Sequence, residues 1–167
     1  MKRFTFLLLP VFLAGTALSQ SPNAALSRCD AFHLQGTYAA TYLGWLAFAM
    51  PDGSSLQVSG VIMGVLSVGP TGVLTGNVTV STQMGKAVWE TMEGSTVAIN
   101  ADCTGTITTY SRVKGTSDPA QKEIDRFVMI RDAGELVVMI DDLGPGVIPM
   151  CLGSWKKIAS WPDRAEW

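Results

Sequence analysis

The chain has 167 residues, enough for one domain with a sizeable core after a targeting segment is removed. Its formal net charge is −2, and its charged residues are scattered, which argues against a nucleic-acid partner because phosphate binding needs a basic patch. Hydrophobic residues make up 47% of the chain and glycine is abundant. Short apolar stretches that contain Gly and Thr, without a helical period, predict an all-β protein.

The chain begins with the pattern of a secretory signal peptide. Lys2 and Arg3 precede an apolar run at 4–17, and small residues follow it. We predict a signal peptide at 1–19, cleaved near Ser19 or Gln20, and a single domain at 20–167 that is secreted or otherwise extracytoplasmic. A retained membrane anchor is the alternative, but the run is short for a bilayer span. No later stretch predicts an integral membrane segment.

Turn-forming residues divide the rest of the chain into strands. Pro51-Asp52-Gly53-Ser54 and Gly69-Pro70-Thr71-Gly72 combine the fixed φ of proline with the freedom of glycine. Residues 114–122 predict an exposed loop, and Asp132-Ala133-Gly134 predicts a hairpin turn. Residues 83–93 predict either a long hairpin loop or an extension of the fourth strand. The predicted strands are 34–49, 56–68, 73–82, 94–100, 103–112, 126–131, 135–141 and 150–159.

Two of these strands meet at a tight polar corner. Apolar residues alternate with polar ones along 94–110, as in a strand with one buried face. Asn100, Asp102, Thr104 and Gly105 supply the corner, because Asn and Asp close local turns and glycine accepts positive φ. Cys103 lies inside it, where it can join this hairpin to another part of the chain.

Eight antiparallel strands in succession predict an up-and-down barrel, because closure removes the two unpaired edges of an open sheet. An interior of this size is either filled by side chains or open to one small ligand. Residues 127–130 and 136–140 are apolar on both faces. They predict either a homo-oligomer or a packed terminal segment, and the alternative is a filled core with a partly apolar exterior.

Three cysteines in an exported protein leave one unpaired after a disulfide forms. Odd-numbered strands of an up-and-down barrel start at the same end, so Cys29, before the first strand, lies near Cys103, at the start of the fifth. We predict a Cys29–Cys103 disulfide and an unpaired Cys151. Three free thiols packed as small hydrophobic groups are the alternative.

The sequence holds no pattern of a metal site, cofactor site or nucleophilic triad. His33 is the one histidine, and metal ligands normally come in clusters. Two carboxylate pairs are candidates for acid/base chemistry, Glu90 with Glu93 and Asp141 with Asp142. Both lie where solvated loop charges usually lie, so we interpret them as surface charges.

Several short motifs resemble known β-barrel families. The segment Phe32-His33-Leu34-Gln35-Gly36-Thr37-Tyr38 resembles the opening of calycin-type barrels, such as lipocalins, with Tyr38 where they have Trp. Gly72-x-Leu74-x-Gly76-Asn77 and Asp102-Cys103-Thr104-Gly105-Thr106 look like motifs of small secreted barrels with an allene oxide cyclase-like or dirigent-like shape. The resemblance implies a barrel with a hydrophobic cavity and assigns no catalytic residue. Asn77-Val78-Thr79 is also a glycosylation sequon, meaningful only in a eukaryote.

Two functions follow as hypotheses. In the first, the interior of a secreted barrel binds a hydrophobic small molecule, and a cofactor-independent cyclase or isomerase that acts by folding its substrate is one form of this hypothesis. In the second, a non-catalytic secreted protein self-associates, or binds a partner, through apolar outer strands. The ligand-binding wall predicted for the first consists of aromatic residues: Tyr38, Tyr42, Trp45, Tyr110 and Phe127.

Overall fold

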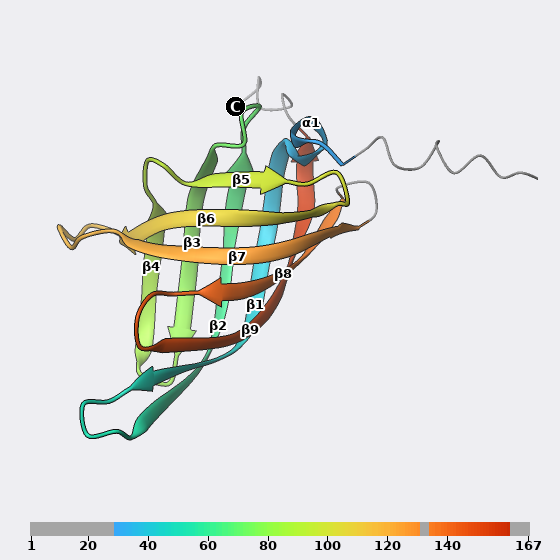
Figure 1. Ribbon diagram of the computed structural model, residues 1–167. Helices are drawn as coiled ribbons and strands as arrows, with labels where there is room; N and C mark the ends of the chain where they lie inside the picture. The colour runs from blue at the N-terminus through green and yellow to red at the C-terminus, as the bar shows by residue number, and fades with distance from the viewer. Residues whose placement is uncertain (1–28, 131–133, 161–167) are drawn as a thin grey trace, which may run out of the picture.

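The computed structural model describes residues 29–130 and 134–160, and the predicted signal peptide lies outside them (Figure 1). The described chain is all-β, with nine strands and one short helix, α1 (Ala31–Leu34). The strands are β1 (Gly36–Ala49), β2 (Ser55–Val68), β3 (Leu74–Thr82), β4 (Gly85–Thr91), β5 (Thr96–Ile99), β6 (Thr104–Val113), β7 (Gln121–Ile130), β8 (Glu135–Asp142) and β9 (Val147–Ser160).

The strands form one antiparallel sheet that closes in a ring. The order is β4-β3-β2-β1-β9-β8-β7-β6-β5, and an additional pairing between β4 and β6 closes it. Most neighbours in the sheet are neighbours in sequence, as the succession of turns predicts. The long pairing of β1 with β9 brings the first and last strands together, and Figure 1 shows them side by side.

The expectation of eight strands is wrong by one, because β4 and β5 are separate strands. Both pair with the same edge of β6: Trp89–Thr91 lies opposite Ser111–Val113, whereas Thr96–Ile99 lies opposite Gly105–Thr108. The register shifts by two residues between them. Ser95 occupies the interruption: its single hydroxyl hydrogen is shared between the carbonyl oxygens of Met92 (2.8 Å) and Tyr110 (3.1 Å), and its oxygen accepts from the Tyr110 N–H.

The beginning of β7 also differs from the prediction. The strand starts at Gln121 and not at residue 126, so part of the expected loop belongs to the sheet. Residues 121–124 pair in antiparallel register with residues 111–108 of β6, and this pairing holds the polar start of β7 in the sheet. Tertiary pairing has therefore overridden its loop-like composition.

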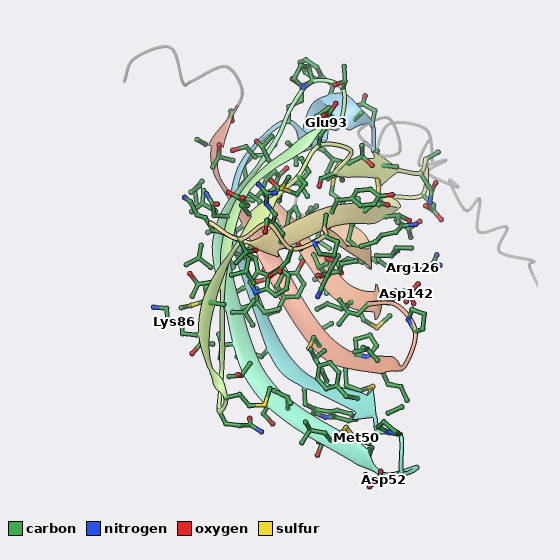
Figure 2. All side chains as sticks on the ribbon, turned by 90° about the vertical axis from the view of Figure 1, so that its left-hand side faces the viewer. Met50, Asp52, Lys86, Glu93, Arg126 and Asp142 are labelled. Atoms are coloured by element: carbon green, nitrogen blue, oxygen red, sulfur yellow. A yellow bond between two sulfur atoms is a disulfide. The ribbon has the colours of Figure 1, made fainter. Side chains whose placement is uncertain are left out.

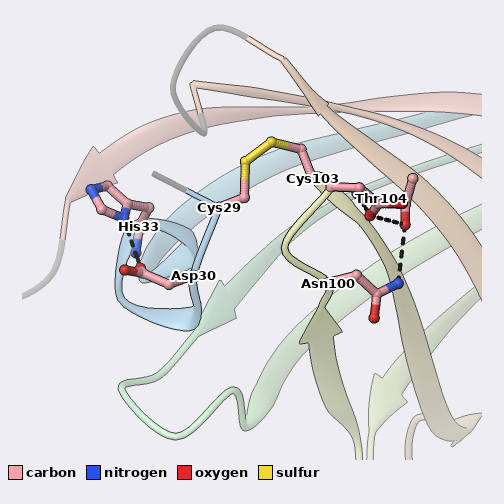
Figure 3. The surroundings of a disulfide bond; sticks show 7 residues. Cys29, Asp30, His33, Asn100, Cys103 and Thr104 are labelled. Atoms are coloured by element: carbon pink, nitrogen blue, oxygen red, sulfur yellow. Dashed lines mark hydrogen bonds and ion pairs between the residues drawn. A yellow bond between two sulfur atoms is a disulfide. The ribbon is translucent and has the colours of Figure 1, made fainter. Parts of the chain in front are cut away.

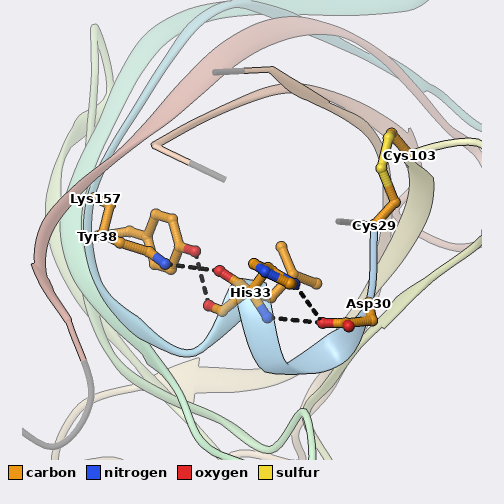
Figure 4. A network of polar contacts seen from close by, with 7 residues as sticks. Cys29, Asp30, His33, Tyr38, Cys103 and Lys157 are labelled. Atoms are coloured by element: carbon orange, nitrogen blue, oxygen red, sulfur yellow. Dashed lines mark hydrogen bonds and ion pairs between the residues drawn. A yellow bond between two sulfur atoms is a disulfide. The ribbon is translucent and has the colours of Figure 1, made fainter. Parts of the chain in front are cut away.

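The end of the ring that carries α1 is filled by the core, which contains Tyr38, Ile107, Leu136 and Trp155, each at most 1% exposed. Hydrogen bonds hold α1 at this end. Asp30 caps its first turn by accepting from the His33 N–H, and the Tyr38 hydroxyl donates to the Leu34 carbonyl at 2.7 Å. The Lys157 ammonium donates to the His33 carbonyl at 2.7 Å (Figure 4).

The predicted Cys29–Cys103 disulfide is confirmed, and it ties the segment before α1 to the turn between β5 and β6 (Figure 3). The polar corner forms at the predicted Asn100, Asp102 and Thr104, but the positive φ of the corner (67°) belongs to Cys103 and not to Gly105, which lies in β6. Asp102 Oδ1 accepts from the backbone N–H (3.1 Å) and the hydroxyl (2.6 Å) of Thr104, and the Asn100 amide donates to the same hydroxyl oxygen. Cys151 forms no disulfide, also as expected, and it is buried.

The hairpin of β1 and β2 extends away from the α1 end. Figure 2 shows Met50 and Asp52, in its turn, at the opposite end of the molecule from Glu93. In the described part of the chain, no helix is both long enough and apolar enough to cross a membrane.

Candidate functional site

A cavity of about 340 Å³ occupies the part of the ring away from α1. Its wall takes residues from β1, β2, β3, β4, β6, β7, β8 and β9, so the closed sheet surrounds it. Alternate residues of each strand face inward, as the pleat requires. The wall is mostly apolar and includes Leu46, Phe48, Ile62, Val80, Trp89 and Ile140.

A buried chain of hydrogen bonds separates this cavity from the packed core. Trp155 Nε1 donates to the Tyr42 hydroxyl oxygen at 2.8 Å, and this hydroxyl donates to Asp125 Oδ2, also at 2.8 Å. The three residues come from β9, β1 and β7, and all three border the cavity. Asp125 is only 2% exposed. Burial and the neighbouring Asp125 carboxyl raise the pKa of Tyr42, so the phenol remains a hydrogen-bond donor.

Glu123 lies two residues before Asp125, on the same face of β7. Burial raises the pKa of Glu123, and burial together with the Glu123 carboxyl raises that of Asp125 well above its ordinary value. If Glu123 and Asp125 were both ionised, Asp125 Oδ1 would have no hydrogen-bond donor among the described residues. A single proton held between the two acids satisfies that oxygen and halves the buried charge.

Two other polar residues of the wall have simpler roles. Glu90 accepts from Arg112 Nε at 3.0 Å, so its charge is compensated. The Cys151 thiol lies 3.7 Å from the Trp45 carbonyl oxygen, and burial, with the nearby Glu123 charge, raises its pKa. The thiol is therefore protonated and unreactive at neutral pH.

The five aromatic residues expected to form the ligand wall are divided among three places. Tyr42 and Trp45 border the cavity. Tyr38 and Phe127 belong to the packed core, at 0% and 2% exposure. Tyr110 is only partly buried and lies at the interruption between β4 and β5, where its backbone bonds to Ser95.

The carboxylates that sequence reasoning singled out are not the ones in the cavity's acid pair. Asp141 binds Arg126 Nε at 2.9 Å, and Asp142 accepts from the Gly144 N–H in a turn. Glu93 is exposed. A signal for the correct pair was present, because Glu123 and Asp125 continue the inward alternation of Phe127 and Met129.

Within 29–130 and 134–160, no group of three or more His, Cys, Asp or Glu residues is placed to hold a metal ion. The chain matches no family model and no curated protein.

Proposed function

We propose that the ring is a calycin-like up-and-down barrel, in which β4 and β5 share one position, and that its cavity binds a largely nonpolar small molecule. The cavity carries this proposal. Its volume of about 340 Å³ and its apolar, aromatic wall with a few grouped polar atoms are typical of small-molecule sites. We further propose that the mature protein is exported, with which its disulfide is compatible.

The same cavity suits a cofactor-independent cyclase or isomerase, which the sequence also suggests. Holding a flexible nonpolar substrate in a near-attack geometry accelerates a unimolecular reaction without any cofactor. Binding is the property common to a carrier and an enzyme, so it is the property to test first.

The test is a fluorescence titration with N-phenyl-1-naphthylamine, a hydrophobic probe that is neutral near pH 7. We expect saturable binding that Val80→Trp, which fills the cavity, weakens by about tenfold or more. Val65→Trp is the matched control on the outer face of the neighbouring strand, where Val65 is 48% exposed. Binding that is unaffected by Val80→Trp, or weakened equally by both variants, would show that the probe binds elsewhere.

A second candidate function is self-association through the outer face. Leu43, Leu152 and Met139 lie opposite one another across β1, β9 and β8, and are 62%, 60% and 48% exposed. Apolar rows of this kind mark interaction surfaces. Sedimentation of the wild type and of a Leu43→Lys, Leu152→Lys double variant tests this candidate. If the outer face mediates self-association, the wild type sediments as an oligomer and the double variant as a monomer. A monomeric wild type would eliminate this candidate.

A further inference from the structure

The acid pair gives the cavity a chemical preference within the proposed function. Around the cavity, the described wall residues include three acids, Glu90, Glu123 and Asp125, and one base, Lys122, which is exposed. Arg112 compensates Glu90. Glu123 and Asp125 have no such cationic partner among the hydrogen bonds and ion pairs of the described chain. The pair itself therefore carries a net negative charge whenever it has lost at least one proton.

Asp125 has one buried oxygen that lacks a hydrogen-bond donor from the described protein. Its Oδ2 accepts from Tyr42, while Oδ1 is buried and has no protein hydrogen-bond donor among the described residues. A buried carboxylate oxygen without a donor is costly, and a donor with positive charge satisfies it best. The aromatic rings of Tyr42 and Trp155 border the same space, and such rings also favour a cation.

We propose that the cavity preferentially binds hydrophobic amines, with the ammonium group at the Glu123–Asp125 pair and the apolar body along the strand walls. This inference rests on the proposed function and names its ligand class. Binding involves no covalent step: the ammonium N–H groups donate to the two carboxyl groups, and a proton shared by the acids in the empty cavity is released to solvent as the pair becomes fully ionised.

Proton release makes the preference pH-dependent. The groups near the pair are Tyr42 on β1, Cys151 on β9 and Asp141 on β8, and Asp141 is paired with Arg126. Tyr42 and Cys151 stay neutral because burial raises their pKa values, so the acid pair itself dominates the titration. Amine affinity therefore rises as the pH increases through the raised pKa values of the pair, as long as the amine remains protonated.

The experiment compares n-octylamine with 1-octanol by calorimetry as a function of pH. At pH 8 we expect the amine to bind about tenfold or more tightly than the alcohol, as a charge-assisted hydrogen bond implies. Asp125→Asn and Glu123→Gln keep the side-chain shapes and should each remove most of this preference. Asp118→Asn, which removes an exposed carboxylate from the loop before β7, is the control and should leave the preference intact.

The outcomes separate this inference from the proposed function. Equal affinities for amine and alcohol would overturn the inference and leave the apolar site standing. A preference that survives both acid-pair variants would also overturn it, because the ammonium would then bind elsewhere. If neither compound binds and N-phenyl-1-naphthylamine does not bind, the proposed function fails as well. Retained binding of that neutral probe by the variants shows that they are folded.

Discussion

Tyr42→Phe tests whether the buried chain of hydrogen bonds holds the base of the cavity together. The phenol oxygen joins Trp155 Nε1 and Asp125 Oδ2, each at 2.8 Å. Trp155 and Asp125 are 1% and 2% exposed, so removal of the oxygen leaves a buried donor and a buried acceptor without their partner. Each such group costs about 1–3 kcal/mol, so we expect a loss of about 2–6 kcal/mol in the free energy of unfolding.

Urea unfolding of the oxidised protein measures this loss, and Tyr38→Phe is the matched control. Tyr38 is equally buried, but its hydroxyl makes one hydrogen bond, to the Leu34 carbonyl. We expect Tyr38→Phe to cost roughly half as much, about 1–2 kcal/mol. If Tyr42→Phe costs no more than Tyr38→Phe, the chain is not a cooperative support, and our account of the cavity base is refuted.

Three further predictions concern the disulfide, the acid pair and one close contact. Replacing Cys29 and Cys103 by Ala, which opens a loop with a sequence separation of 74, should cost about 4–5 kcal/mol in urea unfolding, and an unchanged midpoint would contradict this. Because the folded protein raises the pKa of Asp125, its stability should fall as pH rises from about 4 through that raised pKa. Asp125→Asn should reduce this fall, measured as the unfolding temperature at each pH. If the unfolding temperatures of the wild type and the variant fall equally with pH, Asp125 does not titrate as described. A Cβ on Gly105 would overlap the Phe127 ring, so Gly105→Ala should cost about 2 kcal/mol or more, and wild-type stability would disprove the close contact.

Local turn chemistry and strand parity were sufficient to predict much of the fold. Asn100 and Asp102 mark their corner by residue type alone, and the structure bears this out. The Cys29–Cys103 pairing was predicted from alternating strand directions, and it holds despite the ninth strand because β4 and β5 run in the same direction, both antiparallel to β6. These features depend on properties that short stretches of sequence carry.

Features that depend on pairing between distant strands were harder to predict. The separation of β4 from β5 comes from a register shift against β6, which no local pattern specifies. The same limitation hid the acid pair. Residues 121–125 have the composition of a loop, and only their pairing with β6 makes them a strand and turns Glu123 and Asp125 inward.

Native mass spectrometry of the protein purified from its own host, followed by solvent extraction, tests the cavity most directly. We expect one nonpolar molecule per chain, which Val80→Trp reduces and Val65→Trp retains. An extract enriched in amines would agree with the ligand class inferred from the acid pair. A protein that carries no passenger, and takes up none when nonpolar compounds are added, would contradict a ligand-binding cavity.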